Sequence, residues 1–136
     1  MTVVERFEDV VSVDDLKTIR EFVRETTSKL GATAELVDDI VLATDEAISN
    51  IIVHGYQEKS GPLIIEIEKI KGNIQISLQD QAPPFDPTQY LSQSVSNQDH
   101  IPVGGFGLRV MKQMMNELHY TALPNIGNRL VLTKRI

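Results

Sequence analysis

Residues 63–78 constrain the fold most strongly, because they read as two strands joined by a tight turn. Apolar and polar side chains alternate along Leu63–Ile70, the period-two pattern of a strand with one buried face. Lys71-Gly72-Asn73 then predicts a hairpin turn, and Ile74–Leu78 is the return strand, which ends in Asp80. An antiparallel sheet with one buried face is therefore predicted, and helices have to cover that face.

Two helical patterns precede this hairpin. Ser12 offers a helix N-cap and Gly31 stands where a helix ends, with apolar side chains at helical spacing between them. A second helix is predicted from Thr33 to about His54, where Gly55 stops it, and it carries one wide apolar stripe.

The remaining elements complete a two-layer fold. Thr2–Phe7 reads as a first strand, a third helix opens at Gly104, and Leu118–Leu123 and Arg129–Ile136 read as the last two strands. This order predicts an α+β fold: a two-layer α/β sandwich in which three helices cover one face of a mixed, mostly antiparallel sheet. We expect one domain over residues 1–136, because this length leaves little room for two.

Composition and charge exclude several classes of protein. Hydrophobic residues make up 41% of the chain, enough for a core and above the range of disordered chains. With 13 basic and 19 acidic residues the net charge is −6, so a nucleic-acid partner is not expected. The absence of cysteine excludes disulfides and thiolate metal sites. No apolar stretch could cross a bilayer and no signal peptide is present, so we expect a cytoplasmic protein without membrane contact.

Residues 81–102 differ in composition from the rest of the chain. They hold four of the six prolines, many Ser, Gln and Asn residues, and few apolar side chains. A loop of this length in a compact domain is usually a functional lid or disordered. It contains no lysine or arginine, and His100 is its only potential cation.

Three short motifs carry chemistry, although each alone also fits a plain structural role. Glu46 and Asn50 share one face of the second helix, where an Asn oxygen suits Mg²⁺ and a Glu can deprotonate a nucleophile; an exposed polar face is the simpler reading. Asp80 at a strand end can accept a hydrogen bond from an exocyclic amine, or be a turn aspartate. Gly104-Gly105-Phe106-Gly107 at a helix start lets the backbone approach phosphates, or serves as a hinge.

The order and spacing of these motifs are more specific than any one of them. LATDEAISNIIVHGY, then DQAPPFDP, then GGFGLRVMKQMMNEL resembles the three boxes of the GHKL ATPase superfamily of gyrase, histidine kinases and their relatives. Within it, the chain is most similar to the small stand-alone anti-sigma-factor serine kinases of the bacterial switch type. The resemblance covers nearly the whole chain, and it implies the Bergerat ATPase fold with ATP or ADP and Mg²⁺ bound.

The resemblance also implies roles for individual residues. Glu46 looks like the general base, Asn50 like the Mg²⁺ ligand and Asp80 like the adenine-binding aspartate. The segment of about 81–103 looks like the ATP lid. The other positions that match nucleotide-binding residues of the family are Ala82, Phe85, Gly104, Gly105, Phe106, Gly107, Leu108 and Asn128.

Three departures from the family pattern bear on the chemistry. Ala82 replaces the glycine of the usual D-x-G box, which is tolerable if its backbone φ is negative. Asn128 follows Gly127 where the family often has a threonine whose hydroxyl supports the adenine aspartate, and an amide could do the same. Because the lid lacks basic residues, phosphate charge would rest on Mg²⁺, backbone amides and Arg109 or Lys112.

Two functions stay open. The resemblance implies an anti-sigma factor with serine/threonine-protein kinase activity toward an anti-anti-sigma (STAS) antagonist, which decides by partner switching whether a sigma factor is held. The alternative is a nucleotide-dependent binding module without phosphoryl transfer, which the lid without basic residues favours. An ATPase domain of a sensor histidine kinase is disfavoured, because no helical segment with a phospho-accepting histidine is found.

The sequence contains few signals for surfaces that bind a partner protein. A homodimer is expected from the resemblance alone. Arg20 and Arg24 on the first helix could meet an acidic partner, although a solvated helix face is the simpler reading.

Overall fold

The structure is a computed structural model, and it describes residues 4–87 and 103–136. Its strands form one sheet in the order β1-β2-β3-β5-β4, and each of the four neighbouring pairs is antiparallel. The predicted mostly antiparallel sheet is thus confirmed, and no parallel pair occurs in the described ranges. The strands are β1 (Glu5–Val11), β2 (Gly61–Ile70), β3 (Asn73–Asp80), β4 (Glu117–Leu123) and β5 (Gly127–Arg135).

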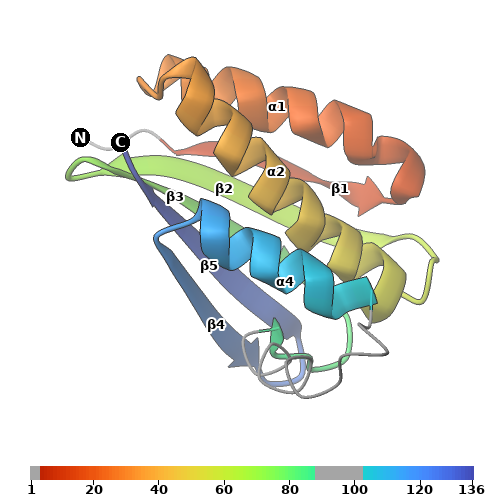
Figure 1. Cartoon of the computed structure of the whole chain (residues 1–136). Helices are drawn as coiled ribbons and strands as arrows, with labels where there is room; N and C mark the ends of the chain where they lie inside the picture. The colour runs from red at the N-terminus through yellow and green to blue at the C-terminus, as the bar shows by residue number, and fades with distance from the viewer. Residues whose placement is uncertain (1–3, 88–102) are drawn as a thin grey trace.

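The helices α1 (Leu16–Lys29), α2 (Ala34–Asn50) and α4 (Val103–Met114) lie on one face of this sheet (Figure 1). Helix α2 lies in the middle and packs against both of the others. The predicted two-layer α+β sandwich is confirmed, with a single layer of helices over a five-stranded sheet.

The core lies between the two layers and follows the alternation of the strands. On β2 and β3 every second side chain faces the helices and is buried. Each such isoleucine or leucine contributes about 1.5–3 kcal/mol when it leaves water. The fully buried side chains of the two strands are Leu63, Ile65, Ile67, Ile74, Ile76 and Leu78.

Both predicted helix starts are present. The Ser12 hydroxyl accepts a hydrogen bond from the Asp14 amide at 3.3 Å, and the Ser12 amide donates to Asp15 Oδ2 at 2.8 Å. This capping box opens a short 3₁₀ turn that leads into α1. The Thr33 hydroxyl caps α2 by accepting from the Leu36 amide at 3.3 Å.

Three boundaries differ from the prediction. The last strand begins at Gly127 rather than Arg129, because its pairing with β4 starts at Gly127 and Leu123. The first strand runs over Glu5–Val11 rather than 2–7, because its pairing with β2 extends as far as Val11 and Gly61. Most of its side chains are exposed, as on an edge strand, so hydrophobicity did not mark its extent. The predicted turn at 60–62 lies earlier, where Gln57 and Glu58 adopt positive φ, and Gly61 already belongs to β2.

Helix α2 does not end at Asn50 but continues as one π-helical turn, Ile51–Gly55. The predicted helical extent to His54 and the stop at Gly55 are therefore confirmed. A π-turn of this kind is rare and often lies at a functional site. Among the helices of the described ranges, none combines the length and the apolar character needed to cross a bilayer.

Candidate functional site

A pocket lies at the end of the sheet where β3 stops and the π-helical turn follows α2. It unites five residues that the sequence singled out, on three different segments: Asn50, Asp80, Ala82, Phe85 and Asn128. It encloses about 40 Å³. That volume is enough for a few water molecules and well below the usual size of a ligand pocket.

Asp80 is at the base of this pocket because it continues the inward alternation of β3. It follows Ile76 and Leu78 on the helix-facing side of the strand, so its carboxylate lies where a core residue would otherwise be. Only 4% of its surface is exposed. A charge in such a position requires hydrogen-bond partners.

Asn128 supplies those partners from the neighbouring strand. It pairs directly with Asp80 in the β3–β5 register, and its amide nitrogen donates to Asp80 Oδ1 at 2.9 Å. The Ala82 backbone amide donates to the same oxygen at 2.9 Å. The amide of Asn128 therefore contacts the aspartate in the way that was expected of the family's hydroxyl.

The pKa of Asp80 is raised above its ordinary value, and burial is the main cause. The hydrogen bonds from the Asn128 side chain and from the backbone amides of Ala82 and Asn128 lower it again in part. Burial likewise raises the pKa of Tyr120, whose ring lines the pocket, so this hydroxyl keeps its proton at neutral pH.

Gly127 allows β5 to run this close to Asp80. A Cβ atom at position 127 would lie 2.0 Å from the backbone oxygen of Asp80. No side chain fits there, so glycine at this position is what lets Asn128 pair with the aspartate.

Ala82 and Gly55 fit each other on the pocket wall. A Cβ atom on Gly55 would lie 2.8 Å from the Cβ of Ala82, closer than real methyl groups approach. Ala82 is not among the residues with positive φ, so the condition for alanine in place of the family's glycine is met. The missing side chain at position 55 thus compensates for the extra methyl at position 82.

Tyr56 was not predicted as part of the site, yet its hydroxyl links two segments at the edge of the pocket. Its hydroxyl donates to the Pro62 carbonyl oxygen and accepts from the Gln81 amide at 2.8 Å. It thereby ties the end of the π-helical turn to the starts of β2 and of the segment after Asp80. Its position directly after His54-Gly55 was visible in the sequence, but these long-range contacts were not.

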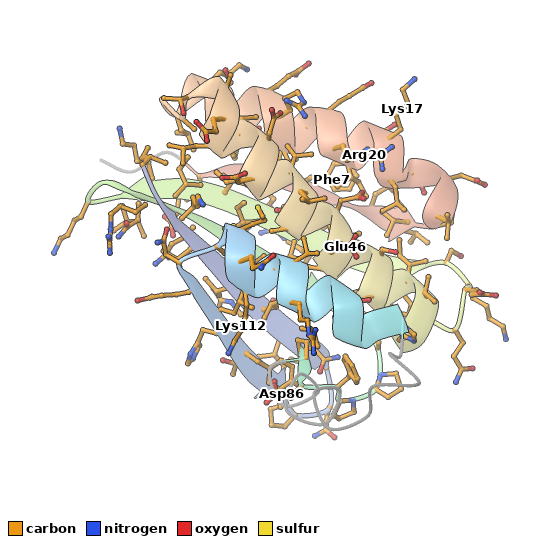
Figure 2. All side chains as sticks on the ribbon, in the orientation of Figure 1. Phe7, Lys17, Arg20, Glu46, Asp86 and Lys112 are labelled. Carbon is orange, nitrogen blue, oxygen red and sulfur yellow. The ribbon has the colours of Figure 1, made fainter. Side chains whose placement is uncertain are left out.

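Asn50 and Glu46 lie on successive turns of α2 and differ in their relation to the pocket. Asn50 lines it, and the buried Nδ2 atom of Asn50 has no hydrogen-bond partner among the described residues. An unpaired buried donor costs about 1–3 kcal/mol, so an oxygen atom of a ligand would be stabilised here. Glu46 is half-buried and lies outside the pocket lining, one turn toward the N-terminus on the α2 ribbon (Figure 2).

The first turn of α4 contains the glycine motif. Gly104, Gly105 and Gly107 all lie within α4, which begins at Val103. Leu108 is 1% exposed and belongs to the hydrophobic core. The side chain of Phe106 and residues 88–102, which hold most of the expected lid, lie outside the described residues.

Arg109 and Lys112, the cations expected to assist with phosphate, are exposed on α4. Among the described residues, no group of three His, Cys, Asp or Glu side chains could hold a metal ion. The Asn50 side chain suits a ligand that carries both charges: its oxygen can ligate a cation, and its Nδ2, which has no partner among the described residues, can donate to an anion.

The two arginines of α1 are already paired within the molecule. Arg20 Nη1 lies 3.0 Å from Asp45 Oδ1, and Arg24 Nη1 lies 2.8 Å from Asp38 Oδ1. Both pairs join α1 to α2, and Arg20 points from α1 toward the α2 ribbon in Figure 2. The Arg24–Asp38 pair is exposed and contributes roughly 0–1 kcal/mol to stability, while the Arg20–Asp45 pair is partly buried.

The sequence matches a known family over most of its length. Residues 11–134 match the family described as the histidine kinase-like ATPase domain. The serine-protein kinase RsbW of Staphylococcus aureus (strain MRSA252) is 31% identical over 116 residues, which are 80% of this chain and 72% of that relative. An anti-sigma F factor of Clostridium novyi (strain NT) is 27% identical over 111 residues, which are 80% of this chain and 78% of that relative.

Two solved structures share the fold. The RsbU and RsbW domains of a Mycobacterium tuberculosis protein align with a TM-score of 0.66 at 20% identity, over 96% of this chain and 32% of that longer chain. The SiaB–SiaC complex from Pseudomonas aeruginosa aligns with a TM-score of 0.66 at 14% identity, over 97% of this chain and 88% of the matched chain. Fold and sequence agree: the chain belongs to the family of histidine kinase-like ATPase domains, in the branch that includes anti-sigma F factors and RsbW serine-protein kinases.

Proposed function

We propose that this protein is a cytoplasmic anti-sigma factor that binds ATP with Mg²⁺ and phosphorylates a serine or threonine of an anti-anti-sigma (STAS) partner. The observation that carries the nucleotide-binding part is the buried carboxylate of Asp80, oriented by Asn128 at the base of a pocket with apolar walls. The kinase part is supported by the relatives named RsbW serine-protein kinases.

The pocket suits adenine better than guanine. Two hydrogen bonds at 2.9 Å end on Asp80 Oδ1, and a carboxylate has further lone pairs, so we propose that Asp80 Oδ2 accepts from the exocyclic amine of adenine. Guanine carries a carbonyl oxygen at the same place, which a carboxylate repels. Ile51, Met111 and Leu130 offer apolar surface to the flat ring. Since the pocket encloses only about 40 Å³, we expect the wall of residues 82–87 to move outward when the ring enters.

Asn50 and the first turn of α4 are the proposed phosphate end of the site. A Mg²⁺ ion held there would supply positive charge beside the triphosphate. Asn50 would hold the ion with its side-chain oxygen and donate its unpaired Nδ2 to a ligand oxygen. The backbone amides around Gly104, Gly105 and Gly107 would donate to the phosphates, helped by the positive end of the helix dipole.

Glu46 is the proposed general base. It would take the proton of the partner's hydroxyl while that oxygen bonds to the γ-phosphorus. The bond from the γ-phosphorus to the bridging oxygen breaks, and ADP leaves with both electrons of that bond. Glu46 lies one helical turn from Asn50, so the proposed base and the residue proposed to hold Mg²⁺ share one face of α2.

The partners of the relatives suggest those of this chain. Two relatives are named for anti-sigma activity or serine-protein kinase activity, and a solved neighbour is a complex of SiaB with SiaC. We propose that this protein binds a sigma factor and a STAS protein alternately, and that it acts as a homodimer. A single domain over 1–136 with an ATP lid at about 81–103 is part of the same proposal.

A nucleotide-dependent binding module without phosphoryl transfer is the second candidate. The specific observation in its favour is that residues 81–103 contain no lysine or arginine. A lid of this composition adds no positive charge to stabilise the transferring phosphoryl group.

Transfer of labelled γ-phosphate from ATP to a STAS protein separates the two candidates. We expect Glu46→Gln to lower the rate by at least about 100-fold while ADP affinity changes by less than about twofold, because the base acts only in the chemical step. Glu35→Gln, an exposed glutamate on the same helix, is the matched control and should transfer label at the wild-type rate. Tight binding of ADP with no label in any STAS protein would rule out the kinase and leave the binding module.

A further inference from the structure

Asn128 forms several hydrogen bonds besides the one that it donates to Asp80. Its Nδ2 also donates to the backbone oxygens of Ala82 at 3.2 Å and Pro83 at 3.1 Å. Its Oδ1 accepts from the Phe85 amide at 3.0 Å and from the Tyr120 hydroxyl. One buried amide thus contacts the carboxylate of the pocket and three backbone groups just beyond it.

The partners determine which way this amide faces. The oxygens of Ala82 and Pro83 can only accept hydrogen bonds, and the Phe85 backbone amide can only donate one. If the Asn128 amide were turned over, its oxygen would face three oxygens and its nitrogen would face an N–H group. Since Oδ1 must therefore be the acceptor, the Tyr120 hydroxyl has to be the donor in its bond with Asn128.

The register of the sheet explains why these residues meet. Asn128 is opposite Asp80 on β3 and opposite Ala122 on β4, and Tyr120 is two residues before Ala122 on the same inward side. Asn128 itself is 6% exposed. Only a side chain with both donors and an acceptor can serve all these groups; the single hydroxyl of a threonine reaches too few of them.

We infer that Asn128, held in one orientation by Tyr120, couples nucleotide recognition at Asp80 to the position of residues 82–85. This inference rests on the proposed nucleotide site and adds two positioning residues to it. Residues 82–85 belong to the wall of residues 82–87, which we expect to move outward when a ring enters. Entry of an adenine at Asp80 would then strain or break the bonds of Asn128 to residues 82–85 and shift this segment.

Hydrogen exchange of the Phe85 amide, followed by NMR, tests the coupling with and without ADP. Asn128→Thr keeps a hydroxyl for Asp80 but cannot hold the 82–85 wall. Without nucleotide, we expect the Phe85 amide of this variant to exchange at least about tenfold faster than in wild type. With ADP, wild type should show a changed rate at Phe85, and the variant should show no further change.

Tyr120→Phe tests the orienting role, because it removes one donor to Asn128 and leaves the ring in place. We expect ADP affinity to fall about three- to tenfold, with faster exchange at Phe85. Thr27→Val is the control: it removes a buried hydroxyl that bonds to the Val23 carbonyl oxygen within α1 and does not line the pocket, so Phe85 exchange should stay at the wild-type rate. Global unfolding of each variant, measured separately, identifies any rate change that comes from general loss of stability.

The outcomes separate this inference from the proposed function. If the Phe85 amide of nucleotide-free Asn128→Thr exchanged at the wild-type rate, Asn128 would not hold residues 82–85 in place. That result would overturn the inference whatever the protein binds. Equal acceleration of Phe85 exchange in Thr27→Val and Tyr120→Phe would overturn the orienting role of Tyr120. If wild type binds no ADP, the proposed function fails, and the coupling to a nucleotide fails with it. Phe85 exchange without nucleotide still decides whether Asn128 holds residues 82–85.

Discussion

At the scale of single residues, the buried carboxylate of Asp80 lowers the stability of the fold, and it is also the group proposed to bind the nucleotide base. Its place in the inward alternation of β3 takes a carboxylate out of water, and this burial raises its pKa. Asn128 and the Ala82 amide recover part of that cost through hydrogen bonds to the carboxylate. A charge kept in such a place at a cost to stability is typical of a binding site.

Asp80→Asn should separate binding from folding. The asparagine oxygen can still accept from Asn128 and from the Ala82 amide, so the fold is retained. Its amino group replaces the oxygen proposed to receive adenine, and two donors then face each other. We expect ADP affinity to fall at least about 10- to 100-fold, as for loss of a hydrogen bond to a charged group. Isothermal titration calorimetry measures it; unaltered affinity would show that Asp80 does not contact the base.

The same variant has a predicted pH dependence. Because the pKa of Asp80 is raised in the folded state, the folded protein holds this proton more tightly than the unfolded chain does. Below the ordinary pKa of 3.8 the carboxyl is protonated in both states, and its burial costs no stability through charge. As the pH rises from there through the higher pKa of the folded state, the charged form lowers the free energy of unfolding, and above that pKa the loss is complete. Denaturant unfolding at a series of pH values should therefore show the stability of Asp80→Asn relative to wild type increasing with pH across that window. A constant difference would contradict the burial argument.

At the scale of elements, the site depends on how the end of α2 meets the sheet. The π-helical turn brings Gly55 against Ala82, and Tyr56 bonds to Pro62 and to Gln81. At the far end of the helical layer, Lys134 of β5 donates to the Met114 carbonyl oxygen at the end of α4, and it lies 3.5 Å from Asp39 of α2. Helices and sheet are thus joined by specific polar contacts at both ends of the core.

Exchanging the methyl group between Gly55 and Ala82 tests the contact at the pocket end. Gly55→Ala alone places two methyl carbons 2.8 Å apart, and we expect it to cost about 1–3 kcal/mol of unfolding free energy. Adding Ala82→Gly removes the clash, so the double variant should recover most of the loss. Urea unfolding of the four proteins gives the coupling, expected to be at least about 1 kcal/mol. Additive effects would mean that the two positions do not touch.

At the scale of the whole molecule, one layer of helices over a five-stranded sheet leaves the pocket at the edge of the core. Its walls come from α2, β3, α4, β4 and β5 together, so a ligand there contacts both layers. Binding of that kind stabilises the folded state of the whole domain by mass action.

Thermal unfolding with ADP measures this linkage. At a free ADP concentration of about 100 times the dissociation constant, the gain is about 2.7 kcal/mol, or very roughly 10 °C for a domain of this size. GDP should raise the midpoint much less, because its ring carries no exocyclic amine at the position proposed to face Asp80. Asp80→Asn is the negative control. An equal shift with GDP would remove the basis for adenine specificity.

The sequence by itself determined the elements and their order. Periodicity, the caps at Ser12 and Thr33 and the turn at Lys71-Gly72-Asn73 are local signals, and the structure has both capped helices and the hairpin where they were predicted. The edge strand β1 was misplaced because an exposed strand carries little hydrophobic signal. The candidate site was found through spaced motifs, and Asn50, Asp80, Ala82, Phe85 and Asn128 do line one pocket.

Only the tertiary structure decided how those residues work together. The five contacts of Asn128, the part played by Tyr120 and the fit of Gly55 to Ala82 join positions that lie far apart in the chain. They follow from strand register and from the packing of α2 on the sheet, and a short motif contains neither. Asp80 could be named from sequence, but its burial, and so its raised pKa, exists only once the helices cover β3.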